Sequence, residues 1–104
     1  MKILIVDDEK IIRRGMISNI PWRKLGLEPP LEARNGAEAL SIFERERPDI
    51  LLTDIRMPLM DGIELSGKVR QFSAEAQIIY MTGHQDMEYI RAAFKQGAVD
   101  YILK

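Results

Sequence analysis

The chain has 104 residues, 46% of them apolar and 30% charged, which is the composition of one ordinary globular domain. Its net charge of −1 offers no basic surface for nucleic acid or an anionic membrane, so we expect DNA contact only through a domain outside this chain. There is no cysteine, which excludes disulfides and thiolate metal sites, and no apolar run approaches the roughly 20 residues of a membrane helix. These features predict a soluble, cytoplasmic protein.

Short apolar segments alternate with segments of helical periodicity along the whole chain. The pattern predicts strands over residues 2–6, 27–33, 50–53, 77–81 and 99–103, and helices over residues 9–20, 37–47, 63–72 and 86–96. Because strands and helices alternate in this order, the connections are expected to be right-handed crossovers. The sequence therefore predicts an α/β domain with a parallel, doubly wound sheet.

Prolines mark the boundaries of the first helix and of the strand that follows it. Helical spacing of apolar residues runs through the segment 9–20, and Pro21 ends it. Trp22 is expected to anchor the following loop by packing. The strand over 27–33 contains Pro29-Pro30, which cannot donate ladder hydrogen bonds, so it should lie at the edge of the sheet. The apolar positions of the first helix are Ile11, Ile12, Met16, Ile17 and Ile20.

Charged side chains stand where three of the apolar segments end. Asp7 and Asp8 follow the first strand, Asp54 follows the apolar part of the third, and Lys104 follows the fifth. The carboxyl ends of parallel strands share one edge of the sheet, which is where open α/β sheets bind ligands. Three carboxylates brought together there repel one another unless a cation compensates them. The pattern predicts a divalent oxygen-ligand site for Mg²⁺, with Lys104 to offset incoming negative charge.

Four sequence blocks, in this order and at this spacing, resemble one known family. They are Val6-Asp7-Asp8-Glu9, Asp54-Ile55-Arg56-Met57-Pro58-Leu59-Met60-Asp61-Gly62, Met81-Thr82-Gly83 and Gly97-Ala98-Val99-Asp100-Tyr101-Ile102-Leu103-Lys104. Over its whole length, residues 1–104, the chain resembles the receiver domain of bacterial two-component response regulators. Two shorter segments resemble the receivers that precede AraC-type helix-turn-helix output domains: Ile20-Pro21-Trp22 with Leu25-Gly26, and Gly83-His84-Gln85-Asp86-Met87-Glu88-Tyr89.

The resemblance implies a role for each matching residue. Asp54 would be the phosphorylation site, and its carboxylate would attack phosphorus to form an acyl phosphate. Mg²⁺ would be held by Asp8 directly, by Asp7 through water, by Asp54 and by the backbone carbonyl of Arg56. Lys104 and the hydroxyl of Thr82 would contact the phosphoryl oxygens. Thr82 and Tyr101 would form the switch pair that transmits phosphorylation to the surface.

The resemblance also implies a flavodoxin-like fold with five parallel strands in the order 2-1-3-4-5. That order places the second strand at the edge, in agreement with the interpretation of Pro29-Pro30. Family members continue past the lysine with a proline and a final helix, whereas this sequence stops at Lys104. We therefore expect a receiver domain that ends before its last helix, with apolar surface uncovered on one face of the sheet.

The function implied by the resemblance is a phosphoacceptor switch rather than an enzyme. It would take a phosphoryl group from a sensor histidine kinase and control an output domain that binds DNA and regulates transcription. Homodimerisation on phosphorylation is expected by family analogy, and no membrane association is expected.

Two other functions remain open at this point. An aspartate-dependent phosphatase would also combine Mg²⁺ with a nucleophilic aspartate, but such enzymes resemble Asp-x-Asp with a following Thr, and Asp54-Ile55-Arg56 lacks the second acid. A phosphorylation-independent scaffold would be expected to have lost an acid or the lysine, and all are present. Turnover of a soluble phosphomonoester would favour the phosphatase, whereas labelling that stops at one phosphate favours the receiver.

Overall fold

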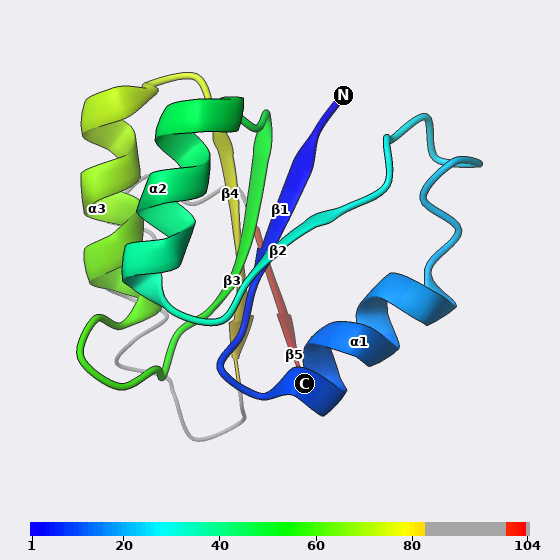
Figure 1. The fold of residues 1–104 in the computed structure, drawn as a ribbon, viewed down its shortest axis with the longest axis horizontal. Helices are drawn as coiled ribbons and strands as arrows, with labels where there is room; N and C mark the ends of the chain where they lie inside the picture. The colour runs from blue at the N-terminus through cyan, green and yellow to red at the C-terminus, as the bar shows by residue number, and fades with distance from the viewer. Residues whose placement is uncertain (83–99, 104) are drawn as a thin grey trace.

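A five-stranded parallel sheet in the order β2-β1-β3-β4-β5 forms the centre of the computed structural model, which describes residues 1–82 and 100–103 (Figure 1). The strands are β1 (Ile3–Val6), β2 (Leu31–Ala33), β3 (Ile50–Asp54), β4 (Gln77–Thr82) and β5 (Asp100–Leu103). The described helices are α1 (Lys10–Asn19), α2 (Gly36–Glu46) and α3 (Gly62–Phe72). The predicted α/β class and strand order are confirmed. The helix predicted over residues 86–96 lies outside the described residues.

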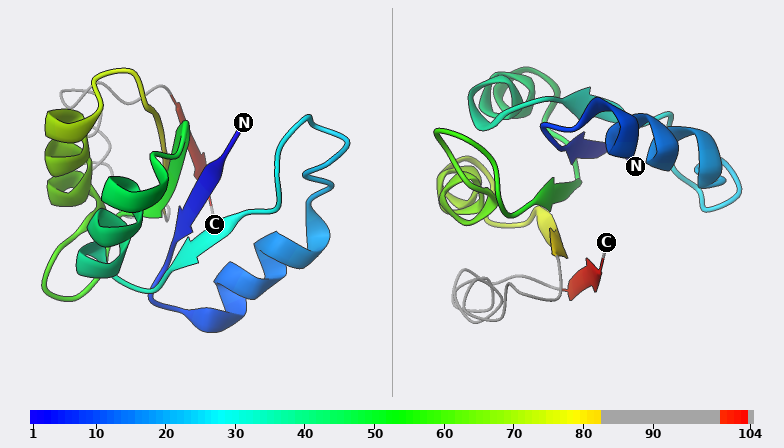
Figure 2. Two further views of the ribbon diagram at one scale, coloured as in Figure 1. Left: turned by 45° about the horizontal axis from the view of Figure 1, so that its top comes forward. Right: turned by 90° about the horizontal axis from the view of Figure 1, so that it is seen from below.

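Helices cover the sheet on both faces, with α2 and α3 against one face and α1 against the other (Figures 1 and 2). Strand β1 shows the consequence of this arrangement. Leu4 and Val6 join the apolar cluster under α2 and α3, while Ile3 and Ile5 join the cluster beside α1. All four residues of β1 are therefore buried, which explains why the strand has a continuous apolar run instead of an alternating one.

Uncovered apolar surface was predicted on one face of the sheet, without saying which. On the face beside α1, Ile50 and Ile79 are only partly buried, whereas Leu52 and Met81 are buried. The side chains of β5 lie outside the described part of the structure, so the extent of the uncovered surface stays a prediction.

Strand β2 is shorter than the predicted segment 27–33, because only Leu31–Ala33 pairs with β1. The residues before it use their backbone donors elsewhere: Leu27 N–H donates to the Trp22 carbonyl and Glu28 N–H to the Met1 carbonyl. Pro29 and Pro30 contribute no donor at all. The predicted edge position of this strand is confirmed, and the same prolines explain its late start.

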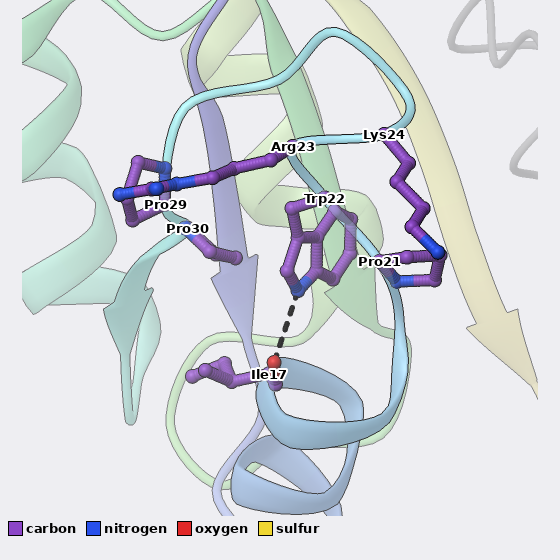
Figure 3. A pocket seen from close by; sticks show the side chains of 7 residues that line it. All are labelled: Ile17, Pro21, Trp22, Arg23, Lys24, Pro29 and Pro30. Atoms are coloured by element: carbon purple, nitrogen blue, oxygen red, sulfur yellow. Dashed lines mark hydrogen bonds between the residues drawn. The ribbon is translucent and has the colours of Figure 1, made fainter.

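Trp22 anchors the loop after α1, as predicted. It is buried in the apolar cluster on the α1 face of the sheet. Its indole N–H donates to the backbone carbonyl of Ile17 over 3.2 Å, so the polar atom of the ring is satisfied (Figure 3). Figure 3 also shows Pro21, Pro29 and Pro30 lining the pocket around the ring.

The inward face of α1 differs from the predicted apolar positions. Ile11 was included among them, but its side chain is 88% exposed. The other predicted positions, Ile12, Met16, Ile17 and Ile20, are partly buried. Position 13 shares a face with positions 16, 17 and 20 at helical spacing, and its residue, Arg13, is 8% exposed. A charged residue therefore occupies a place in the contact stripe that the apolar pattern did not reveal.

Candidate functional site

Parallel pairing brings the predicted acidic residues to one edge of the sheet. Val6 of β1 stands in register with Thr53 of β3, so the next residues along the two strands, Asp7 and Asp54, emerge side by side. Asp8 follows Asp7 at the start of the loop to α1. Among the described residues, these three acids form the group that could hold a metal ion, with one carboxylate oxygen from each lying within 4.8 Å of the others.

The three carboxylates differ in their access to solvent. Asp7 is fully buried and Asp54 is 4% exposed, whereas Asp8 is exposed. Two buried carboxylates this close to a third are electrostatically unfavourable without a compensating positive charge. The exposed position of Asp8 leaves an approach from solvent on its side of the cluster. The arrangement favours a cation that enters from solvent and meets the buried acids.

The donor set suits Mg²⁺. This ion takes oxygen ligands at about 2.0–2.1 Å, so two of its ligands lie at most about 4.2 Å apart. Oxygens within 4.8 Å of one another are close enough for side-chain rotation to bring them around one ion. Three protein oxygens leave the remaining octahedral positions for water, which Mg²⁺ commonly retains.

The loop after β3 holds Asp54 through its backbone. Gly62 N–H donates to the Ile55 carbonyl over 2.7 Å and closes the loop that begins after Asp54. A Cβ atom at position 62 would clash with the backbone carbonyl oxygen of Asp54 and lie 3.0 Å from Ile55 Cα. Asp61 caps α3 by accepting a hydrogen bond from Glu64 N–H over 2.8 Å. Glycine is therefore required at position 62 by close backbone packing under the acidic cluster.

The loop after β1 holds Asp7 through three hydrogen bonds. Asp7 N–H donates to the Ala33 carbonyl over 3.2 Å, and Asp7 Oδ1 accepts from Glu9 N–H over 2.9 Å. Asp7 O accepts a buried hydrogen bond of 2.7 Å from Arg13 Nη1. Arg13 was not among the predicted site residues, because periodicity alone treats a basic residue on a helix as solvated. Its one sequence signal was its helical spacing from the apolar residues of the segment 9–20, which places it on the buried face of α1.

The remaining predicted site residues are placed only in part. Arg56 lies directly beyond Asp54 and Ile55 with an exposed side chain, and the metal role of its carbonyl stays a prediction. Thr82 is the last residue of β4, one position past Met81, which pairs with Asp54. Tyr101 lies on β5 in register with Tyr80. The side chains of Thr82 and Tyr101, and the whole of Lys104, lie outside the described part of the structure.

Comparison with known proteins agrees with this architecture. Residues 3–104 match the family described as the response regulator receiver domain. The chain belongs to this family.

Individual relatives carry regulatory names. The chain is 43% identical to the uncharacterized transcriptional regulatory protein YesN of Bacillus subtilis over 99% of its own length and 28% of that protein. It is 35% identical to the transcriptional regulatory protein HptR of Staphylococcus aureus, again over 99% of this chain and 40% of the relative. The chain thus spans less than half the length of these curated relatives.

Solved structures show the same fold. A two component transcriptional regulator AraC from Clostridium phytofermentans is 43% identical and superposes with a TM-score of 0.93, covering 100% of this chain and 81% of the other. The REC domain of AraT, a response regulator from Geobacillus stearothermophilus, is 39% identical with a TM-score of 0.92, covering 99% and 80% of the two chains. In the described residues, no helix is long and apolar enough to span a membrane.

Proposed function

We propose that this domain accepts a phosphoryl group on Asp54 and acts as the switch of a two-component signalling system. The observation that carries the proposal is the convergence of Asp54 with Asp7 and Asp8 at the carboxyl edge of the sheet. Membership of the receiver family supports the same role. The phosphoryl donor would be a phosphorylated histidine of a sensor kinase.

In the proposed step, a carboxylate oxygen of Asp54 attacks phosphorus in line with the leaving nitrogen of the phosphohistidine. A P–O bond forms, the P–N bond breaks, and its electron pair remains on the imidazole, which leaves as neutral histidine after protonation. Asp7, Asp8 and the backbone carbonyl of Arg56, with Asp54 itself, would hold Mg²⁺. When bound, this ion supplies positive charge beside the phosphoryl oxygens. Lys104 and the Thr82 hydroxyl would contact those oxygens from the β4 and β5 side.

Loop packing supports Asp54 as the nucleophile. Its backbone is fixed between the β3–β4 pairing and the close contact of Gly62, so the carboxylate is held at the edge of the sheet. A nucleophile held in position lowers the entropy that must be lost on reaction. The exposed Asp8 leaves the donor an approach to the cluster from solvent.

The test is labelling with a small phosphodonor and Mg²⁺, followed by intact-mass spectrometry. The wild-type chain should gain one phosphate, and Asp54→Asn should gain none, because an amide is not a nucleophile. Asp61→Asn is the matched control, since it neutralises an aspartate of the same loop while asparagine still caps α3. Robust labelling of Asp54→Asn would disprove the assignment.

The proposal makes the domain a stoichiometric switch and not an enzyme. Labelling that stops at one phosphate, without turnover of a soluble phosphomonoester, separates it from a phosphatase. Its output would pass through Thr82 and Tyr101 to a DNA-binding domain outside this chain, of the AraC type, and phosphorylation would favour a homodimer. The names of the transcriptional relatives support this output, and a cytoplasmic location fits a partner kinase.

A further inference from the structure

Arg13 joins three separate parts of the chain beside the acidic cluster. Its Nη1 donates to the Asp7 carbonyl over 2.7 Å, and its Nε donates to Glu32 Oε1 of β2 over 2.7 Å. The guanidinium therefore ties α1 to the loop after β1 and to the edge strand at once. Arg13 is 8% exposed, so its two hydrogen bonds are largely shielded from water. Charge-assisted hydrogen bonds of this length, in a shielded place, are stronger than neutral ones.

The bond to the Asp7 carbonyl has a consequence for Asp8. The Asp7 carbonyl and the Asp8 N–H belong to one planar peptide unit, so fixing the oxygen fixes the direction in which the chain enters Asp8. Asp8 itself lies beyond the strand and is exposed. Nothing in the strand pairing orients it, since the β1–β3 register ends at Val6. The orientation of the Asp8 carboxylate toward the cluster thus depends on the loop backbone.

We infer that Arg13 is a positioning residue for the metal site: held by Glu32, it fixes the Asp7–Asp8 peptide and so orients the Asp8 carboxylate for Mg²⁺. The inference rests on the proposed function, because it concerns the metal that Asp54 phosphorylation uses. Residues that orient metal ligands from behind commonly contribute 10- to 100-fold to metal affinity. Arg13 itself does not contact the ion or the phosphoryl group.

Arg14 provides a matched control. Its Nη2 lies 3.4 Å from Glu32 Oε2, so it pairs with the same carboxylate as Arg13, but its side chain is 60% exposed. Two double variants, Arg13→Met/Glu32→Gln and Arg14→Met/Glu32→Gln, each remove one positive and one negative charge. Both therefore keep the net charge of the wild type beside the acids. They differ in that only the first removes the hydrogen bond to the Asp7 carbonyl. In the second, the amide oxygen of the introduced glutamine can still accept from Arg13 Nε, so Arg13 stays held in place.

The experiment is an Mg²⁺ titration of the wild-type chain and both double variants, followed by the NMR shifts of the Asp8 and Glu9 amides. The Kd for Mg²⁺ should rise about tenfold in Arg13→Met/Glu32→Gln and stay within about twofold of wild type in Arg14→Met/Glu32→Gln. At saturating Mg²⁺, the labelling rate of the first variant should return to within about twofold of wild type. Equal Kd values for the two double variants would overturn the inference. A lower free energy of unfolding with an unchanged Kd would overturn it too, since Arg13 would then be purely structural.

A second variant covers the case in which the first double variant does not fold. Arg13→Lys keeps the charge but has a single nitrogen, which cannot repeat the two-point fork between Glu32 and Asp7. We expect a several-fold higher Kd for Mg²⁺, and a wild-type Kd would overturn the inference. The two proposals also fail differently. If the wild-type chain bound no Mg²⁺, the proposed metal-dependent phosphorylation would be disproved. If the wild-type chain bound Mg²⁺ tightly and substitution of Arg13 left the Kd unchanged, only the positioning role of Arg13 would be disproved.

Discussion

The carboxyl edge of the sheet and the loop after α1 are built on opposite principles. At the carboxyl edge, the strands lead into two buried carboxylates, Asp7 and Asp54, and one exposed one, Asp8. The short loops there are held by a hydrogen bond to the Asp7 carbonyl and by the close approach of Gly62 to Asp54. At the other end of α1, the chain turns through Trp22, whose ring lies in the apolar cluster with its N–H satisfied (Figure 3). Gathering the acids at the carboxyl edge lowers the stability of the fold, whereas burying the Trp22 ring in the loop after α1 raises it.

This contrast separates stability from function within one small domain. Substitutions around Trp22 should lower the free energy of unfolding while leaving the metal site of the folded molecules intact. Substitutions at the acidic edge should change metal binding and phosphorylation, and one of them should make the metal-free fold more stable. Four predictions test the comparison, in order of decreasing effect on stability.

Trp22→Ala should produce the largest loss of unfolding free energy. Removing a buried indole leaves a cavity, and such truncations cost about 3–5 kcal/mol of unfolding free energy. Urea unfolding of the chain measures the loss, and Mg²⁺ affinity of the folded fraction should match wild type. Leu25→Ala, in the same loop but 61% exposed, is the control and should change stability by less than about 0.5 kcal/mol. A loss below about 1 kcal/mol for Trp22→Ala would remove the distinction between the two regions.

Gly62→Ala should combine a loss of stability with a loss of phosphorylation. The added Cβ meets the Asp54 backbone, so the loop and the nucleophile must shift, at a cost of about 1–3 kcal/mol. We expect the labelling rate at saturating Mg²⁺ to fall at least about tenfold, because small displacements of a reacting group are costly. Gly15→Ala is the control: the nearest atom to its added Cβ is Asn19 Nδ2 at 4.0 Å, and alanine in a helix should stabilise the fold by about 0.5–1 kcal/mol. Normal labelling of Gly62→Ala would contradict the proposed packing constraint.

Asp7→Asn should stabilise the metal-free fold and weaken Mg²⁺ binding. One carboxylate oxygen of Asp7 lies within 4.8 Å of an oxygen of each other acid. Unit charges about 5 Å apart repel by roughly 3 kcal/mol at an effective dielectric of about 20, so a gain of about 1–3 kcal/mol is expected on neutralisation. The asparagine Oδ1 can still accept from Glu9 N–H. Urea unfolding without metal and an Mg²⁺ titration check the two effects.

Asp49→Asn is the control for the predicted gain in stability of Asp7→Asn. Asp49 precedes β3 at the opposite edge, where its carboxylate accepts from Lys2 N–H over 2.8 Å, and its neutralisation should leave stability unchanged or slightly lower. Equal and unchanged stability in both variants would show that acid–acid repulsion does not act at the carboxyl edge.

Tyr80→Phe should have the smallest effect at neutral pH and a distinct effect at alkaline pH. The Tyr80 hydroxyl is hydrogen-bonded to Ser66 of α3 in the core, and burial raises the pKa of the phenol above its usual 10.0, with the Ser66 bond partly opposing the rise. The unfolded chain loses this proton near pH 10 while the folded chain keeps it, so this stabilisation is complete below pH 10 and is lost as pH rises through the folded pKa.

The phenylalanine variant should lose about 1 kcal/mol at pH 7 and show a weaker decline of stability above pH 10 than wild type. Urea unfolding of both chains at pH 7 and above pH 10 measures the difference, and the other titrating groups cancel in the comparison. Parallel decline of the two chains would mean that the buried phenol does not govern alkaline stability.

Much of the site was predictable because strand ends are readable from local pattern. Continuous apolar runs before Asp7 and Asp54 indicated buried parallel strands, and parallel strands carry their carboxyl ends to a common edge. Pro29 and Pro30 indicated the edge strand for a chemical reason, the missing donor, and the pairing of β2 with β1 alone confirms it.

The amino-acid sequence by itself thus determined the α/β class, the strand order implied by resemblance, and the acids that meet. Tertiary structure decided which neighbours hold them. Arg13 is buried and Ile11 exposed because the Glu32 carboxylate of β2 and the Asp7 carbonyl face that side of α1, and these partners lie 19 and 6 residues away. Gly62 is required because the returning loop brings it onto the Asp54 backbone. Local periodicity reports hydropathy along one element, whereas burial of a charge or the need for a missing Cβ arises only when separate elements come into contact.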